Sequence, residues 1–236
     1  MSERDPVDAA LADGRTTLTE AESKRLLADW GIETPAFRVV SAADEAVDAA
    51  ESIGYPVVVK VSSPAVSHKS EWGDGAGVAL GLESDAAVRE AVDAIHDAAD
   101  AAGVAVDVLV EAAADVDAGT EVIVGGLRDP SFGPVVLAGL GGVFTEIFED
   151  TAHRLAPIDQ AEAESALREL TAARLLSGYR GRPPADVPAL ATVVRRVGDL
   201  VDARPEIGEV DVNPVLATAD GALALDALVV LDDDAV

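Results

Sequence analysis

Cysteine is absent from this chain of 236 residues, and lysine occurs only at positions 24, 60 and 69. Without cysteine the chain can form neither a disulfide nor a thiolate metal site. No stretch reaches the roughly 18 consecutive apolar residues of a membrane span, and the opening sequence MSERDPVDAA has no apolar signal-peptide core. We therefore expect a soluble protein of the cytoplasm.

Positive charge is scarce, because 17 lysines and arginines stand against 44 acids, which gives a net charge of −27. Such a surface repels nucleic acid and anionic membranes, so neither is an expected partner. The acids are spread along the chain and 49% of the residues are hydrophobic, which argues against disorder. An acidic coat with almost no lysine predicts a halophilic protein from a high-salt cytoplasm, where salt screens the self-repulsion.

The hydrophobic pattern predicts an α+β (mixed α/β) protein rather than a plain doubly wound sheet. We expect a flexible acidic N-terminus over residues 1–16, one lobe over residues 17–110 and a second lobe over residues 111–236. Helices are expected over residues 19–30, 43–52, 84–102, 159–176 and 188–203. Strands are expected over residues 37–40, 56–61, 77–82, 106–111, 121–125, 134–140, 209–216 and 222–231.

The segment PVVVKVSSPAVSHKSEWGDGAGV, residues 56–78, contains two of the three lysines and one of the three histidines. Its β-branched start predicts a strand buried on both faces, with Lys60 near its end. A buried ammonium group needs an anionic partner. A nucleotide phosphate would serve, and so would a structural ion pair with a nearby glutamate.

Glycines at positions 73, 75 and 77 follow that strand. Glycine allows backbone N–H groups to approach an anion closely, although neither a Rossmann fingerprint nor a Walker P-loop is present. The three glycines therefore indicate either a phosphate-binding loop or only a flexible turn. His68 precedes them and is either an ordinary surface or core residue or a phosphoryl acceptor.

Two glutamates fall within predicted strands, Glu111 in VLVEA and Glu121 in GTEVIVGG. Acids flanked by apolar residues of a strand need hydrogen-bond or cationic partners. Groups of a nucleotide or Lys60 would qualify. The alternative is that both glutamates face outward at the edge of a sheet.

The C-terminal segments GEVDVNPV and DGALALDALVV predict a pair of strands joined by a turn at residues 220–221. Asp211 and Asn213 are two residues apart and therefore point to the same face of their strand. The turn can bring Asp226 beside Asn213. Carboxylate and amide oxygens suit Mg²⁺, which usually completes its shell with water and phosphate.

Four segments occur in an order and spacing typical of one family. They are VVVKVSSPAVSHKSEWGDGAGV, VLVEAAADVDAGTEVIVGGLRDPSFGPVVLAGLGGVFTE, SGYRGRPPADV and EVDVNPV. With them the chain, from residue 17 to residue 230, resembles the ATP-grasp subunit of the ADP-forming acyl-CoA synthetases, most closely the beta subunits of ADP-forming acetate–CoA ligases. The family usually has H-K-S-acid-x-G-G-V, whereas HKSEWGDGAGV contains extra residues. We therefore expect the loop tip to sit differently over the phosphates.

The resemblance implies an ATP-grasp fold, in which two lobes clasp ATP or ADP together with Mg²⁺. It places Lys60 and the glycine loop at the phosphates. It places Glu111 near adenine and ribose, and Glu121 elsewhere on the nucleotide. It makes Asn213 and Asp226 ligands of Mg²⁺, with Asp211 as a further candidate.

His68 aligns with a histidine that the family is thought to phosphorylate. The resemblance implies that an acyl phosphate phosphorylates a histidine of a partner subunit, that the phosphoryl group passes to His68, and that it then passes to ADP. Related succinyl-CoA ligases lack the H-K-S segment, which favours the acetate-type branch. Arg154 and Glu146 either orient phosphate and histidine or are surface residues.

No coenzyme A domain is recognised in the sequence, so a larger CoA-binding alpha subunit is the expected partner, in an α2β2 complex. Two other functions stay open at this point. One is a different ATP-grasp carboxylate ligase that uses no phosphohistidine. The other is a non-catalytic nucleotide-binding subunit, which would have no need of a Mg²⁺ site.

Overall fold

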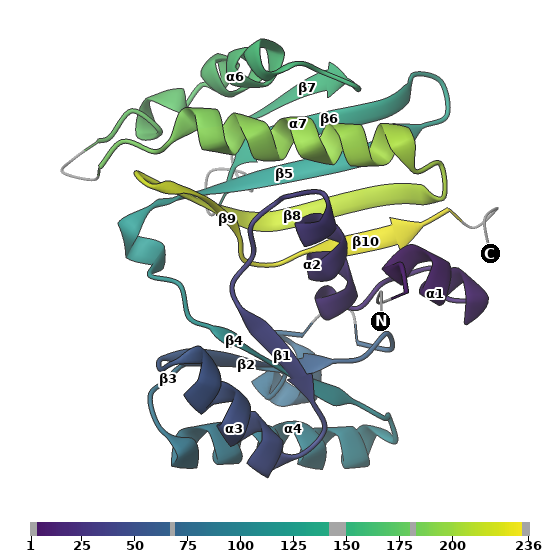
Figure 1. The fold of residues 1–236 in the computed structure, drawn as a ribbon, viewed down its shortest axis with the longest axis vertical. Coiled ribbons are helices and arrows are strands. Elements are labelled where there is room, and N and C mark those ends of the chain that lie inside the picture. Colours follow the sequence, from purple (N-terminus) through teal and green to yellow (C-terminus); the bar gives the residue numbers. More distant parts are fainter. Residues whose placement is uncertain (1–3, 67–68, 142–149, 180–182, 233–236) are drawn as a thin grey trace. The chain divides into compact units, whose positions relative to one another are not determined.

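The computed structural model describes residues 4–66, 69–141, 150–179 and 183–232. Their contacts divide the chain into two compact units. Unit 1 is formed by residues 1–34 and 115–236, and unit 2 by residues 35–114. Each unit combines helices with an antiparallel sheet, so the predicted α+β class is confirmed (Figure 1).

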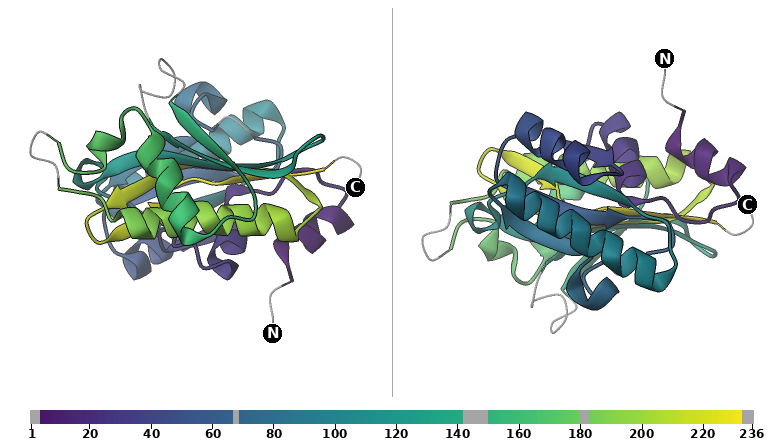
Figure 2. Two further views of the ribbon diagram at one scale, coloured as in Figure 1. Left: turned by 90° about the horizontal axis from the view of Figure 1, so that it is seen from above. Right: turned by 90° about the horizontal axis from the view of Figure 1, so that it is seen from below.

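Unit 2 contains a four-stranded sheet in the order β1-β4-β2-β3, covered on one face by two helices. The strands are β1 (Phe37–Val40), β2 (Val57–Ser62), β3 (Val78–Leu82) and β4 (Asp107–Ala112), and the helices are α3 (Ala43–Ile53) and α4 (Asp85–Ala102). The helices lie side by side (Figure 2). Val57, Val59 and Val61 of β2 belong to the core beneath them. Because side chains alternate along a strand, Lys60 lies on the opposite face.

The ends of α4 follow from its sequence. The hydroxyl of Ser84 accepts a hydrogen bond from the backbone N–H of Ala87 and caps the start of the helix. Gly103 ends it with a left-handed backbone, at φ 67°, which glycine adopts without steric cost. Val88, Val92 and Ile95 form the buried stripe between these ends, so α4 is an amphipathic helix held by its core contacts.

Unit 1 contains a larger antiparallel sheet in the order β10-β8-β5-β6-β7, with β9 paired to β8. Its strands are β5 (Thr120–Asp129), β6 (Gly133–Leu140), β7 (Thr151–Leu155), β8 (Ile207–Thr218), β9 (Gly221–Ala224) and β10 (Leu228–Leu231). Its helices are α1 (Pro6–Ala12), α2 (Glu20–Asp29), α6 (Gln160–Glu169) and α7 (Val187–Ala203). Short 3-10 turns span Val116–Ala118 and Ala173–Leu175 in unit 1 and Trp72–Gly75 in unit 2.

Helix α7 lies along β6, β5 and β8, with α6 beside it (Figures 1 and 2). Gly126 of β5 allows this approach, because a Cβ at that position would lie 2.7 Å from a methyl carbon of Val201. Side chains of all four helices share one apolar core with the sheet. The opposite face of β8 therefore remains free of these helices, and it carries the polar side chains described below.

Several sequence predictions are corrected by the structure. Residues 1–16 were expected to be flexible, but Pro6–Ala12 form α1, whose Val7 and Ala10 are fully buried. Residues 17–34 were assigned to the first lobe, but Leu26 and Leu27 of α2 pack in the core of unit 1. Apolar periodicity shows that a helix has a buried face, but it does not show which sheet that face covers.

Three further elements differ from expectation. The helix predicted over residues 159–176 ends at Glu169, and a separate 3-10 turn follows. The strand predicted over residues 222–231 is divided into β9 and β10. Strand β7 pairs with β6 and was not predicted.

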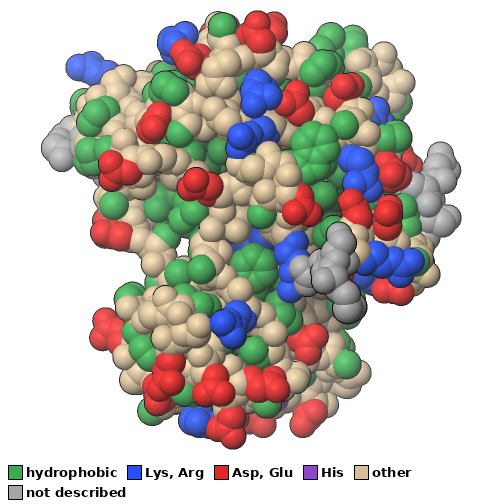
Figure 3. All heavy atoms as spheres, viewed as in Figure 1, with side chains coloured by type: hydrophobic (Ala, Val, Ile, Leu, Met, Phe, Trp, Pro, Cys, Tyr) green, Lys and Arg blue, Asp and Glu red, His purple; other side chains and the backbone are tan. Residues whose placement is uncertain are grey.

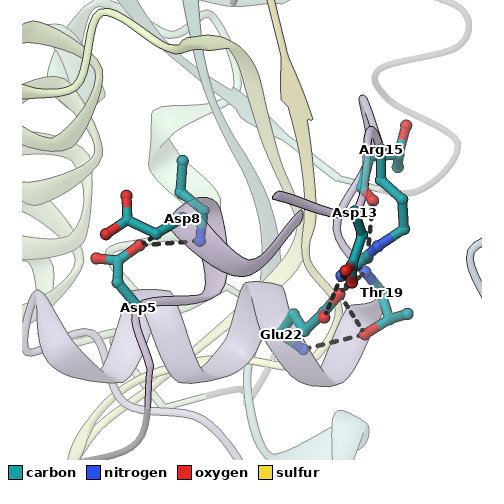
Figure 4. Close-up of polar contacts among 8 residues, drawn as sticks. Asp5, Asp8, Asp13, Arg15, Thr19 and Glu22 are labelled. Carbon is teal, nitrogen blue, oxygen red and sulfur yellow. Dashed lines mark hydrogen bonds and ion pairs between the residues drawn. The ribbon is translucent and has the colours of Figure 1, made fainter. Parts of the chain in front are cut away.

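A polar network fixes the start of α2 (Figure 4). The side chain of Thr19 accepts from the backbone N–H of Glu22, whose carboxylate accepts from the Thr19 backbone at 2.8 Å. Both terminal nitrogens of Arg15 donate to the same carboxylate, at 2.9 and 2.8 Å. Burial alone would raise the pKa of Glu22, but hydrogen bonds from Arg15 and Thr19 bring it below its ordinary value.

Glu22→Gln is expected to lower the free energy of unfolding by about 1 kcal/mol at pH 7, the usual size of a capping interaction. Because the pKa of Glu22 is lowered on folding, this contribution is present above the unfolded-state pKa, near 4.5, and is lost as the pH falls through the folded-state value. Denaturation of both proteins at pH 7 and at about pH 3.5 measures the difference. Glu162→Gln, an exposed change in the first turn of α6, is the control, and an equal loss in both variants would contradict the role of the network.

Acidic side chains are scattered over the surface of each unit, and basic ones are few (Figure 3). In unit 2 they gather over α3 and α4, where Asp44, Asp48, Asp93 and Asp97 are all exposed. Within the described residues, none of the helices has the length and apolar character needed to cross a bilayer.

Candidate functional site

Strand β8 presents a row of polar side chains on the face of the unit 1 sheet that α7 does not cover. Val210 and Val212 are buried against the helices, so Glu209, Asp211 and Asn213 point to the other side. These three residues line a shallow cavity of about 270 Å³, whose apolar floor is provided by β5 and β6. The predicted placement of Asp211 and Asn213 on one face is therefore confirmed.

The loop between β9 and β10 lies beside this row of polar side chains on β8. The backbone N–H of Asn213 donates to the carbonyl oxygen of Asp226 at 3.2 Å, and that of Leu225 donates to the carbonyl of Pro214 at 2.9 Å. The carboxylate of Asp226 accepts from the Ala227 N–H at 2.8 Å. Asp226 was expected on a strand and lies instead between two strands, but the expected proximity to Asn213 is confirmed.

The carboxylates at this site repel one another. Burial raises the pKa of Asp211, and the charges of Glu209 and Asp226 raise it further. A bound cation would relieve that repulsion, and two carboxylates with an amide oxygen are ligands that Mg²⁺ accepts. The described residues contain no group of three or more His, Cys, Asp or Glu side chains able to hold a metal by themselves. Water and substrate phosphates would have to complete the shell, as is usual for Mg²⁺.

Unit 2, taken by itself, contains a buried ion pair. The ammonium of Lys60 on β2 lies 2.7 Å from a carboxylate oxygen of Glu111 on β4. Lys60 pairs with Leu109 and Glu111 with Val58, so the two side chains are diagonal neighbours on the face away from the helices. Only 7% of Lys60 and 3% of Glu111 is exposed.

This pair decides one of the open alternatives, the position of Glu111 in the sheet. Lys60 is buried, as the sequence predicts, and it has a glutamate partner. Glu111 is not an edge residue, because β4 lies between β1 and β2. Contact of either side chain with a nucleotide stays a prediction.

Glu121 lies on β5, which is flanked by β8 and β6, so it too is not at an edge. It pairs with Leu216, three residues beyond Asn213 along β8, and its side chain is partly buried. Its carbonyl accepts a hydrogen bond from the N–H of Gly141 at 2.8 Å. The role at the nucleotide that resemblance assigns to Glu121 stays a prediction.

The glycine segment forms a compact turn rather than an open flexible loop. Gly73, Asp74 and Gly75 have φ angles of 59°, 56° and 95°, which lie in the left-handed region that favours glycine. A Cβ at Gly77 would overlap the carbonyl oxygen of Lys69. Contact of Gly73, Gly75 or Gly77 with phosphate stays a prediction.

Comparison with known proteins identifies the family to which this chain belongs. A model of the ATP-grasp domain matches residues 9–231. The beta subunit of an ADP-forming acetate–CoA ligase I from Pyrococcus furiosus is 40% identical over 235 residues, which cover 97% of each chain. The chain belongs to the ATP-grasp family, among the beta subunits of the ADP-forming acetate–CoA ligases.

Other members of this ATP-grasp group are longer or have solved structures. An ADP-forming acetate–CoA ligase I from Archaeoglobus fulgidus is 41% identical over 217 residues, and the match covers only 31% of that protein. A chain of the acetyl-coenzyme A synthetase 1 of Ca. Korarchaeum cryptofilum, in complex with coenzyme A and Ca-AMPCP, is 39% identical. It superposes with a TM-score of 0.91 over 98% of this chain and 100% of the other.

Two further structures of that Korarchaeum protein describe a phosphohistidine segment. In one, which contains Mg-AMPPCP, the segment points towards the nucleotide-binding site, and the TM-score is 0.84. In the other the segment is phosphorylated and has an orientation called site I, and the TM-score is 0.88.

Three further residues were predicted from the sequence: His68, Glu146 and Arg154. His68 and Glu146 lie outside the described residues. Arg154 on β7 donates to the carboxylate of Glu169 at 2.6 Å and to the carbonyl of His153 at 2.9 Å. It is therefore engaged in an ion pair within unit 1, in keeping with the surface alternative.

Glu209 was not predicted, although it is the third acidic or amide side chain on the same face of β8. The alternation Glu-Val-Asp-Val-Asn contains the signal, because residues 209, 211 and 213 all share one face. Its charge raises the pKa of Asp211 and would attract the same cation.

Proposed function

We propose that this chain is the nucleotide-binding beta subunit of an ADP-forming acid–CoA ligase. The complete enzyme would convert acyl-CoA, ADP and phosphate into a carboxylic acid, ATP and CoA, or run in reverse, with acetate as the first candidate acid. The main support for the proposal is that the chain matches an acetate–CoA ligase beta subunit over nearly the whole length of both proteins. The carboxylates and the amide that unit 1 brings together would supply the Mg²⁺ ligands that this function needs.

The proposed site residues act through charge and position, as phosphoryl transfer requires. Asn213 and Asp226, with Asp211, would hold Mg²⁺, which when bound offsets the negative charge of the phosphates. Lys60 would supply a second positive charge to them. We assign Glu111 and Glu121 to the nucleotide itself, and the backbone of the turn at Gly73, Gly75 and Gly77 to its phosphates.

His68 is the proposed carrier. A neutral imidazole nitrogen attacks the phosphorus of a phosphohistidine on the partner subunit, so that one N–P bond forms as the other breaks. A terminal oxygen of ADP then attacks the phosphorus on His68, which forms ATP and returns the imidazole. Histidine suits both steps because its nitrogen is nucleophilic near neutral pH without a strong base.

The partner we propose is a CoA-binding alpha subunit in an α2β2 complex. The name of the Pyrococcus relative is that of one subunit of a larger ligase. The Archaeoglobus relative is a single chain of which this chain spans about a third, which is what a fusion of both subunits would give.

Reconstitution with the alpha subunit tests the proposal. The two chains together should form ATP from acetyl-CoA, ADP and phosphate, and neither should do so alone. His68→Asn should abolish ATP formation while calorimetry shows ADP binding unchanged. Full activity of His68→Asn would favour an ATP-grasp ligase without a phosphohistidine, and inactivity of the wild-type pair would contradict the proposed function.

We also infer that the protein works in a cytoplasm of high salt concentration. Raising KCl from 0.1 to 1 M shortens the screening length from about 10 Å to about 3 Å, which weakens the repulsion among the exposed acids. The melting temperature should therefore rise by at least about 2 °C, the smallest shift that 1–2 kcal/mol produces in a chain of this size. Sucrose at equal osmolality is the control for effects other than screening. A melting temperature that is flat or falls with KCl would contradict the inference.

A further inference from the structure

Another cavity of unit 1 lies in its helix layer, between α6 and the start of α7 (Figure 1). Its volume is about 510 Å³, which is within the range of small-molecule sites. Its most buried lining residues are Leu167 and Leu176, at 0% and 3% exposure, and Val187 lies beside them. Because these side chains pack with the helices, the cavity lies on the other side of the sheet from the polar row on β8.

Hydrogen bonds hold the chain around this cavity in place. The carboxylate of Asp150 accepts from the backbone N–H groups of Thr171 and Ala172, at 2.8 and 2.9 Å, directly after the end of α6. The N–H of Ala185 donates to the carbonyl of Leu176 at 2.9 Å, just before α7 begins. The cavity therefore exists before any ligand binds, which reduces the entropic cost of binding.

Arg174 lines this cavity and differs from other arginines of unit 1. Arg154, Arg195 and Arg204 each form an ion pair with an acid. Within the part of the chain that the structure describes, the guanidinium of Arg174 has no carboxylate or carbonyl partner. It lies over the ring of Tyr179, 5.6 Å from the centroid, in a cation–π contact. In a chain with a net charge of −27, such a guanidinium beside an apolar cavity indicates a site for an anion.

Arg168 supplies a second cation to the lining of the cavity. It forms an ion pair with Glu164, which lines the same cavity. That contact uses one terminal nitrogen of the guanidinium, and a guanidinium has several N–H donors, so donors of Arg168 remain for a ligand. The two arginines and the one glutamate leave the lining with a single net positive charge, which matches a ligand with one negative charge.

We propose that this cavity binds a monocarboxylate with an aromatic or branched aliphatic body. The carboxylate accepts from Arg174 in the bidentate manner that guanidinium groups favour, and the body covers Leu167, Leu176 and Val187. A nucleotide or a phosphate is disfavoured, because the acidic chain repels a multiply charged anion more strongly. This carboxylate site shares no residue with the proposed nucleotide site, so it goes beyond the proposed function and does not depend on it.

Titration calorimetry of the whole chain with phenylacetate tests the carboxylate site. Three comparison ligands separate the charge from the body: acetate keeps the carboxylate, phenylacetamide keeps the body, and inorganic phosphate is an anion without a body. Phenylacetate should bind at least about tenfold more tightly than each of them, because the charged hydrogen bonds and the burial of the ring both contribute to its affinity. Absence of saturable phenylacetate binding, or equal binding of any comparison ligand, would overturn the proposal.

Variants and NMR spectra show where the ligand binds. Arg174→Gln should weaken phenylacetate binding at least about tenfold, because it removes the charged donor. Arg195→Gln removes the same charge from an ion pair on α7, and this control should bind phenylacetate like the wild type. The methyl signals of Leu167 and Leu176 should shift on titration of the wild type.

Unchanged binding by Arg174→Gln, or methyl signals that do not move, would place the ligand elsewhere and overturn the assignment. These measurements follow binding alone. Failure of the reconstituted enzyme to form ATP would contradict the proposed function and would leave the result for the carboxylate site unaffected.

Discussion

Asp226→Asn or Asn213→Ala is expected to lower the rate of Mg²⁺-dependent ATP formation by at least about 100-fold. A metal ion bound to phosphates supplies several kcal/mol of charge stabilisation, and each 1.4 kcal/mol or so changes the rate about tenfold. The backbones of the two residues are joined by a hydrogen bond of 3.2 Å. Either change removes one ligand and leaves that backbone contact in place. The loss should therefore appear in the rate and in the Mg²⁺ concentration required, not in the stability of unit 1.

The matched control for this prediction is Asp220→Asn. It removes the same charge from the exposed turn between β8 and β9. Activity is titrated with Mg²⁺ for the wild type and all three variants. Unchanged Mg²⁺ dependence of Asp226→Asn and Asn213→Ala would place the metal elsewhere.

The second large effect concerns the buried pair in unit 2. Removing one member of a buried ion pair typically costs about 3–5 kcal/mol, because the remaining charge loses its partner. Lys60 and Glu111 are 2.7 Å apart and almost fully buried. Glu111→Gln and Lys60→Met should each destabilise the chain to this extent, whereas the double variant Lys60→Met/Glu111→Leu should lose much less than their sum.

Urea unfolding of the single and double variants measures this coupling, with Arg89→Gln as control. Arg89 and Asp44 form an ion pair in the same unit, but the side chains are 46% and 85% exposed. Such surface pairs contribute at most about 1 kcal/mol. Additive losses in the Lys60 and Glu111 variants would show that the two charges do not depend on each other.

The fold could be predicted where the sequence pattern is local. The β-branched run after Pro56 predicts the buried strand β2, and Ser84 and Gly103 mark both ends of α4. Local sequence patterns do not predict the features of the fold that depend on tertiary contacts. Asp5 caps α1 and Pro6 stands in its first turn, a signal that could have identified this helix, but the acidic context hid it. The assignment of α2 to unit 1 depends on which core receives Leu26 and Leu27, and no local pattern contains that information.

The part of the candidate site that depends only on the alternation of side chains along a strand could be predicted from the sequence. The spacing of Asp211 and Asn213 correctly placed them on one face, and the turn correctly brought Asp226 near Asn213. Glu111 is the partner of Lys60 because of the register between β2 and β4. That register brings together two residues that are 51 positions apart in the sequence, and it could not be derived from spacing. The shape of the turn Trp72–Gly75 depends likewise on contacts with α4.

Transfer of phosphate to the isolated chain is the most direct test of the proposed carrier role of His68. The chain is incubated with γ-labelled ATP and Mg²⁺, digested, and its peptides are separated. The label should be acid-labile and stable to base, should lie on the peptide containing His68, and should form at least about 100-fold more slowly in Asp226→Asn. Label on any other residue, or equal labelling of His68→Asn, would contradict the claim that this chain carries a phosphoryl group on histidine.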